Sequence, residues 1–376
     1  MKCHVSAFTL VELMVALMVA GALVALISAI TIQAGTSWLR SAGRIETRAQ
    51  ADLIFDRITQ DLEGAIFRRD GNVWLAASFQ SDPQVGKGDA AMSDATWDGC
   101  VKPSGDPAGD ASSSYHLPSE NQPFSRSRFG QAGVWLRFIA AHPDAQSSLH
   151  NLSAPRAVGY QIVRRRVSAS AGASTGSDVP VRYLLYRSSA RPASDTWDDP
   201  DSTFAVGYDL FSTGAPPNYN LGDASRIDNV GNLRTPRRYE QVLGNNVIDF
   251  GVRCWVRDEA SGGIVERFPM KMPERTPVRC FAATVRDGRL RPAVLPPPVG
   301  AGPAMQADEM TYGFPVRIDV LVRILTEEGA RVVEAFENGR VARAAEFDDD
   351  GAYWWFLAAK HSHVYVTSIQ VLSHAL

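Results

Sequence analysis

The sequence is poor in cysteine and balanced in charge, and both features narrow its range of functions. Only 4 of its 376 residues are Cys, and no Cys-x-x-Cys pair occurs. These counts exclude a disulfide-dense scaffold and the common zinc-binding motifs. The 38 Lys and Arg residues against 41 Asp and Glu residues give a net charge of −3, which indicates no basic face. We therefore expect no nucleic-acid partner.

Long hydrophobic runs are absent except for one near the N-terminus. Residues 8–32 read FTLVELMVALMVAGALVALISAITI, with a single charged side chain, Glu12. A helix of about 20 apolar residues crosses a bilayer core, whereas a secretory signal has an apolar core of about 7–15 residues. The run therefore predicts a single-pass transmembrane helix over residues 8–32 that is not cut on its outer side.

Glu12 needs a functional explanation, because a carboxylate inside a membrane helix costs about 2.5–3.5 kcal/mol on insertion scales. No Lys, Arg or His lies within one helical turn of it in the apolar run. We expect a cationic partner that comes from another chain or from a newly made amino terminus.

The segment SAFTLVELMVALMV, residues 6–19, resembles the prepilin signal of type IV pilins and type II secretion pseudopilins. The resemblance implies that a prepilin peptidase cuts between Ala7 and Phe8 and methylates the new amino group of Phe8. Thr9 and Leu10 follow the cut, and Glu12 matches the acidic residue that meets a neighbouring N-terminus during assembly. Residues 1–7 are then the leader. Ala7 departs from the Gly that the family prefers before the cut.

Beyond the membrane segment, residues 33–70 predict an amphipathic continuation of the same helix, ending near Arg68. No proline interrupts it. Apolar residues recur at helical spacing at Ile54, Ile58, Leu62 and Ile66, and Leu53 and Ile45 widen the stripe. Two oppositely charged pairs at i and i+4, Arg48 with Asp52 and Arg57 with Asp61, are expected on its other faces.

Residues 71–376 predict a β-rich head with long loops, one of them at 76–132. Residues 316–323 alternate in polarity, as in a half-buried strand. The expected fold class is α+β, a long N-terminal transmembrane spine helix packed against a mainly antiparallel β-sheet head of the pilin type. Strand-like stretches bounded by turn residues lie at 133–141, 157–167, 181–189, 246–258, 315–327 and 363–372.

The segments around 239–258 and 313–331 resemble a strand pair of minor pseudopilin J and minor pilin W. This resemblance implies a structural, non-enzymatic subunit near the tip of a secretion pseudopilus or a pilus. It also implies an inner-membrane protein with a cytoplasmic N-terminus and a periplasmic head. Its partners would be other pilins or pseudopilins, the prepilin peptidase, membrane lipid and, as a further candidate, a secreted substrate.

Two other functions remain open from the residues alone. The same spine helix would suit a tip adhesin or substrate-binding subunit whose ligand surface lies in the loops. A membrane-anchored periplasmic enzyme would use the helix only as an anchor, but an anchor has no need of Glu12. The motifs HExxH, GxxxxGK[ST] and SxxK do not occur.

Candidate ligand and disulfide positions are few. Cys254 and Cys280 could pair in an oxidising periplasm, and two buried thiols are the alternative. Asp348, Asp349 and Asp350 offer oxygen ligands for calcium, but the full loop spacing is missing, which favours a solvated turn. His361 and His363 predict exposed histidines on one face of a strand. We therefore expect no cofactor, with calcium as the one alternative.

Overall fold

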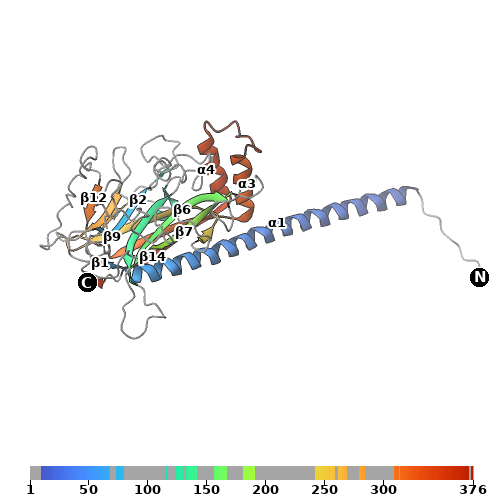
Figure 1. Ribbon diagram of the computed structural model, residues 1–376. Coiled ribbons are helices and arrows are strands. Elements are labelled where there is room, and N and C mark those ends of the chain that lie inside the picture. The colour runs from blue at the N-terminus through green and yellow to red at the C-terminus, as the bar shows by residue number, and fades with distance from the viewer. Residues whose placement is uncertain are drawn as a thin grey trace, which may run out of the picture. The chain divides into compact units, whose positions relative to one another are not determined.

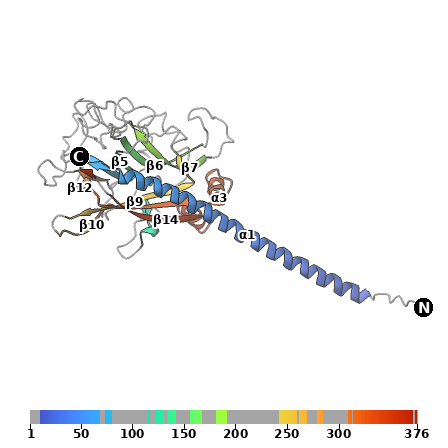
Figure 2. The ribbon, with the colours of Figure 1, turned by 90° about the horizontal axis from the view of Figure 1, so that it is seen from below.

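The computed structural model describes 13 separate stretches of the chain, and they fall into two compact units, residues 1–46 and 47–376. Figures 1 and 2 show how the helices and strands are arranged, with many of them labelled. The described residues are 10–67, 73–79, 115–116, 123–129, 133–141, 156–166, 181–190, 242–258, 261–268, 279–283, 309–312, 314–371 and 374–375.

Helix α1 is continuous from Leu10 to Glu63. Its 54 residues correspond to a length of about 80 Å at 1.5 Å per residue. Gly64 directly follows the helix, and a Cβ there would lie 2.7 Å from the carbonyl oxygen of Ala141. The Ala141 amide donates to the carbonyl of Gly64, so the chain leaves the helix directly beside the end of a strand.

A seven-stranded sheet forms one layer of the second unit, in the order β12-β11-β2-β5-β6-β7-β8. All neighbouring pairs are antiparallel except β11 and β12, which are parallel. The strands are β12 (Glu309–Tyr312), β11 (Arg279–Ala283), β2 (Val73–Phe79), β5 (Val134–Ala140), β6 (Arg156–Arg166), β7 (Val181–Ala190) and β8 (Val242–Asn245).

A four-stranded antiparallel sheet has the order β10-β9-β13-β14. Asn246, with a φ of 57°, separates β8 in the first sheet from β9 in this one. Helices α3 (Glu327–Glu337) and α4 (Asp350–Lys360) lie in the chain between β13 and β14. The strands are β10 (Ile264–Phe268), β9 (Val247–Arg257), β13 (Arg317–Leu325) and β14 (Ser362–Gln370).

Short pairs complete the described structure. Strand β1 (Ile66–Phe67) runs parallel to β15 (His374–Ala375), and β3 (Tyr115–His116) runs antiparallel to β4 (Arg128–Phe129). A single 3-10 turn, η1 (Phe124–Arg126), precedes β4. The α+β class and the antiparallel sheets are confirmed.

The part of α1 that belongs to the second unit contributes to one hydrophobic core shared with both sheets. Ile54, Ile58 and Leu62 are fully buried, as their spacing predicts. Figure 2 shows this part of the helix between β5, β6 and β7 on one side and β9 and β14 on the other. The core also takes in Trp354 and Trp355 of α4.

Several sequence predictions are wrong in detail. Helix α1 stops at Glu63 rather than near Arg68, so Ile66 is buried from strand β1 and not from the helix. Leu53 and Ile45 do not widen the buried stripe, since they are 66% and 71% exposed. The segment 76–132 is not all loop, because it contains most of β2 together with β3, η1 and β4.

Strand β13 differs from the predicted half-buried strand. It lies between β9 and β14, and both of its faces are covered. Asp319 and Arg323, on the face expected to meet solvent, are 4% and 8% exposed. The cost of burying the Asp319 carboxylate is offset by hydrogen bonds that it accepts from Arg253, Trp255 and Ser368 at 2.7–2.8 Å. The pairing of β9 with β13 agrees with the expected strand pair.

A substitution at Gly251 on β9 tests this packing through the stability of the fold. A Cβ at Gly251 would collide with the buried ring of Phe129. We predict that Gly251→Ala lowers the free energy of unfolding by about 1–3 kcal/mol, the usual cost of overpacking a core. Gly263→Ala is the control, because its nearest atom would be 3.4 Å away and the residue is exposed. Denaturant unfolding of the detergent-solubilised chain measures both, and equal stabilities would contradict the packing described.

Candidate functional site

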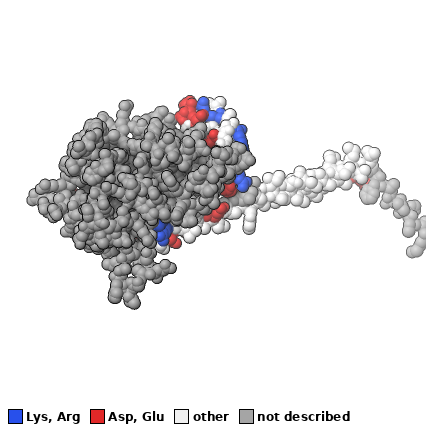
Figure 3. Space-filling model, in the orientation of Figure 1, with Lys and Arg blue, Asp and Glu red and all other residues white. Residues whose placement is uncertain are grey.

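The first unit presents an apolar helix surface. A segment of 26 residues, Leu10–Gly35, has a mean hydropathy of 2.7, and none of its most apolar window is buried. Its side chains are exposed on all sides, as with Leu10 at 75% and Ile32 at 68%. Figure 3 shows this stretch almost without charged groups. By length and composition the segment could cross a membrane or serve as a signal sequence.

Glu12 lies in the first turn of α1 as described, and it is the one acidic residue there. A carboxylate near a helix N-terminus interacts favourably with the positive end of the helix dipole. Leu10 is the first described residue of the helix. Ala7, Phe8 and Thr9 lie outside the described residues, so cleavage and methylation at Ala7 and Phe8 stay predictions.

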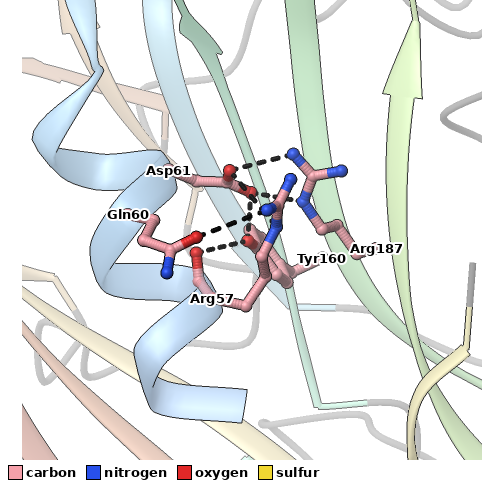
Figure 4. Close-up of polar contacts among 5 residues, drawn as sticks. All are labelled: Arg57, Gln60, Asp61, Tyr160 and Arg187. Atoms are coloured by element: carbon pink, nitrogen blue, oxygen red, sulfur yellow. Dashed lines mark hydrogen bonds and ion pairs between the residues drawn. The ribbon is translucent and has the colours of Figure 1, made fainter. Parts of the chain in front are cut away.

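A second polar site ties α1 to the seven-stranded sheet (Figure 4). Asp61 is fully buried on the helix. Arg187 of β7 donates to its two carboxylate oxygens, from Nε at 2.5 Å and from a terminal nitrogen at 2.9 Å. The hydroxyl of Tyr160 on β6 also donates to Asp61, and Arg57 lies 3.7 Å away on the preceding helical turn. Two adjacent strands thus converge on one helical carboxylate.

Burial and charge together fix the protonation of these partners. Burial raises the pKa of Tyr160 well above its usual value, and the negative charge of Asp61 raises it further. Burial alone would lower the pKa of Arg187, but the hydrogen bond and the charge of Asp61 outweigh that effect and raise it. At neutral pH the site therefore holds a neutral phenol and a cation around one carboxylate, which is an anchoring arrangement.

Further contacts hold the same part of α1 about three to four turns closer to its N-terminus than Asp61. The hydroxyls of Thr47 and Tyr365 are 2.9 Å apart, and the Arg48 guanidinium lies 5.6 Å from the centre of the Tyr365 ring. The Gln50 amide donates to the carbonyl of Asn245, 2.9 Å away. The helix is thus held to β14 of one sheet as well as to β6 and β7 of the other.

Both predicted charge pairs on the helix are present. The Arg48 and Asp52 side chains approach to 3.0 Å at the surface. Arg57 pairs with Asp61, but Asp61 is buried rather than on an outer face. Sequence reasoning therefore missed the anchoring role of Asp61, and it gave no sign of Tyr160 or Arg187. The available signal for burial of Asp61 was its place between Ile58 and Leu62, two positions of the apolar stripe.

The candidate disulfide is not tested by the described side chains. Cys254 is buried on β9 of the four-stranded sheet. Cys280 lies on β11 of the seven-stranded sheet, and its side chain is outside the described residues. Pairing of the two stays a prediction.

The aspartates considered for calcium have local structural partners. Asp349 caps the N-terminus of α4 by accepting from the Ala352 amide at 2.7 Å. Asp350 pairs with Arg343 at 2.9 Å. His361 is the residue that ends α4 and does not share the strand with His363. Within the described ranges, no group of three or more His, Cys, Asp or Glu residues is placed to hold a metal ion.

One catalytic pattern occurs in the sequence. GASTG at 172–176 matches Gly-x-Ser-x-Gly and lies outside the described residues. In hydrolases this pattern joins a strand to a following helix. Here the described elements before and after it are β6 and β7, two strands that pair antiparallel. The flanking structure therefore gives no support to a nucleophile at Ser174.

Comparison of the chain with protein-family models, curated proteins and solved structures finds no match.

Removal of the buried charge on α1 tests the anchoring site. We predict that Asp61→Asn lowers the free energy of unfolding by about 3–5 kcal/mol, because Arg187 would lose its ionic partner while remaining largely buried. Asp52→Asn is the matched control, since its pair with Arg48 is about half exposed and contributes at most about 0.5 kcal/mol. Denaturant unfolding of both variants measures the difference, and equal losses would exclude an anchoring role for Asp61.

Alkaline pH provides an independent test of the same site. The unfolded chain releases the Tyr160 proton near pH 10, whereas the raised pKa retains it in the folded chain. This group therefore leaves stability unchanged below about pH 10 and reduces it as the pH rises above that value. We predict that unfolding free energy falls less steeply between about pH 9.5 and 11.5 in Tyr160→Phe than in the unchanged chain. Parallel pH profiles would contradict this.

Proposed function

We propose that this chain is a minor pseudopilin or minor pilin, assembled at or near the tip of a type II secretion pseudopilus or a type IV pilus-like filament. Its role is structural rather than enzymatic. In this proposal the prepilin peptidase cuts between Ala7 and Phe8 and methylates Phe8. The chain waits in the inner membrane with its N-terminus in the cytoplasm and its head in the periplasm.

The observation that carries the proposal is the position of Glu12. It is one carboxylate within the first turn of a 26-residue apolar helix segment, five positions into the proposed mature chain. A membrane anchor gains nothing from a charge that costs about 2.5–3.5 kcal/mol on insertion. A helix that pairs with the positive N-terminus of a neighbouring subunit recovers that cost on assembly and gains a fixed axial register.

The structure of α1 supports the same function. Its first part is apolar all round, which suits a bilayer and then a bundle of similar helices. Its second part is held in a β-rich unit by a shared core and by Asp61. A subunit that is pulled from a membrane needs such an attachment, because the force reaches the head through the helix. The long head loops expected from the sequence would suit a tip position better than a repeating shaft position.

Glu12→Gln tests the proposed role of the charge. The substitution keeps the size of the side chain and removes its ability to pair with an amino terminus. We predict at least about a tenfold drop in the fraction recovered with sheared filaments, corresponding to a loss of about 1.4 kcal/mol or more. The fraction in the membrane should be unchanged or higher. Immunoblotting of the filament and membrane fractions measures both.

Glu46→Gln is the control, because it removes an exposed acid from the same helix outside the apolar segment. It should enter filaments as the unchanged chain does. If Glu12→Gln were incorporated normally, the apolar segment would be only an anchor and the filament proposal would fail.

A further inference from the structure

The edge strands of the two large sheets differ in how well they are protected. Natural sheets protect an edge from other strands by keeping it short, by charges, by proline or by a bulge. Strands β8 and β12 have four residues each, β8 with a register shift against β7 and β12 with Glu309. Strand β10 has five residues, carries Glu266 and Arg267, and also has a register shift.

Strand β14 is long and contains no charge, proline or bulge that would protect its edge. Its sequence SHVYVTSIQ contains no Lys, Arg, Asp, Glu, Pro or Gly. It pairs with β13 over nine consecutive residues without a register shift. It is an edge strand of the four-stranded sheet, and no described strand lies on the side away from β13. Its composition, rich in β-branched and aromatic residues, favours strand pairing.

This edge is also held in place before any partner binds. Tyr365 contacts Thr47 on α1, and Ser368 donates to Asp319 on β13 at 2.7 Å. Val366, at the centre of the strand, is 42% exposed. A strand fixed on its inner side loses little further conformational freedom when another strand pairs with it.

We propose that β14 is a docking edge for β14 of a second copy of this chain. The two strands pair antiparallel about Val366, and the two four-stranded sheets become one continuous sheet. This contact is isologous, since each copy offers the same surface to the other.

Self-pairing suits this strand chemically. Centred on Val366, it places Val364 opposite Ser368 and Tyr365 opposite Thr367. No Lys, Arg, Asp or Glu of one strand faces another, and aromatic and β-branched neighbours stabilise such pairs. A partner strand with charged residues would gain no ionic contact from β14. The proposal does not rest on the filament function and would hold equally for an anchored protein of another class.

Disulfide trapping in the membrane tests the contact with the full chain. Opposed positions of an antiparallel pair bring their Cβ atoms within about 4.5–5.5 Å, close to the separation in a disulfide. Val366→Cys, treated with a mild oxidant, should yield a reducible species of twice the 40.9 kDa chain mass. Ile264→Cys on the protected edge β10, which is 51% exposed, should remain monomeric, as should the unchanged chain.

Two results would overturn the proposal. One is a dimer yield from Val366→Cys no higher than that from Ile264→Cys. The other is a cross-linked species whose mass shows a different protein, which would mean that the edge serves another partner.

A second measurement needs no new cysteine. Val366→Lys places two like charges opposite each other at the centre of the pair and should weaken dimers of the detergent-purified chain by about fivefold or more. Ile264→Lys should leave the dimer unchanged. Analytical ultracentrifugation gives the dimer affinities, and circular dichroism confirms that both variants are folded. A monomeric unchanged chain, or equal affinities of both variants, would overturn the proposal.

Discussion

The buried carboxylate of Asp61 is the constraint on which the second unit depends. An ionised group without contact to solvent is tolerated only where donors surround it. Arg187 and Tyr160 supply them from adjacent strands, β7 and β6. Because those donors stand at fixed positions of a sheet, they allow one register of the helix against it. A shift by one helical turn would leave Asp61 and Arg187 buried apart.

The same helix must satisfy two different environments. From Leu10 to Gly35 it is apolar on every side apart from Glu12, and its most apolar window is not buried. From Thr47 to Glu63 one face enters the core while Arg48, Asp52 and Leu53 remain outside. A hydrophobic core alone would let such a helix slide, since methyl groups carry little directional information. The polar contacts of Thr47, Gln50 and Asp61 supply that direction.

Periodicity in the sequence predicted the helix and strands in which buried residues recur at a regular spacing. The apolar run gave the first part of α1, and the fourfold spacing of Ile54, Ile58 and Leu62 gave the buried face of the second. All six predicted strand stretches contain strands, and the expected pair β9 and β13 is present. These predictions succeeded because burial of one face against a single neighbouring layer is enough to produce a regular spacing of apolar residues.

What the sequence could not show depends on partners distant along the chain. Asp61 looks like a surface acid paired with Arg57 until Tyr160 and Arg187 are brought to it from about 100 and 126 residues away. Asp319 looks solvent-facing until Arg253 and Trp255 cover it. Helix α4 could not be predicted from Asp348, Asp349 and Asp350, because this run favours a solvated turn as much as a helix start, and Asp349 in fact caps the helix. Short strand β2 shows no clear alternation in VWLAASF.

The proposed function requires a helix that serves filament assembly and not anchoring alone, and the mass of the N-terminus tests this requirement most directly. The chain should be purified from a host with its prepilin peptidase and from the same host without it. We predict a chain that begins at methylated Phe8 only when the peptidase is present. A chain that keeps Met1 in both hosts would contradict it and leave Glu12 without a function.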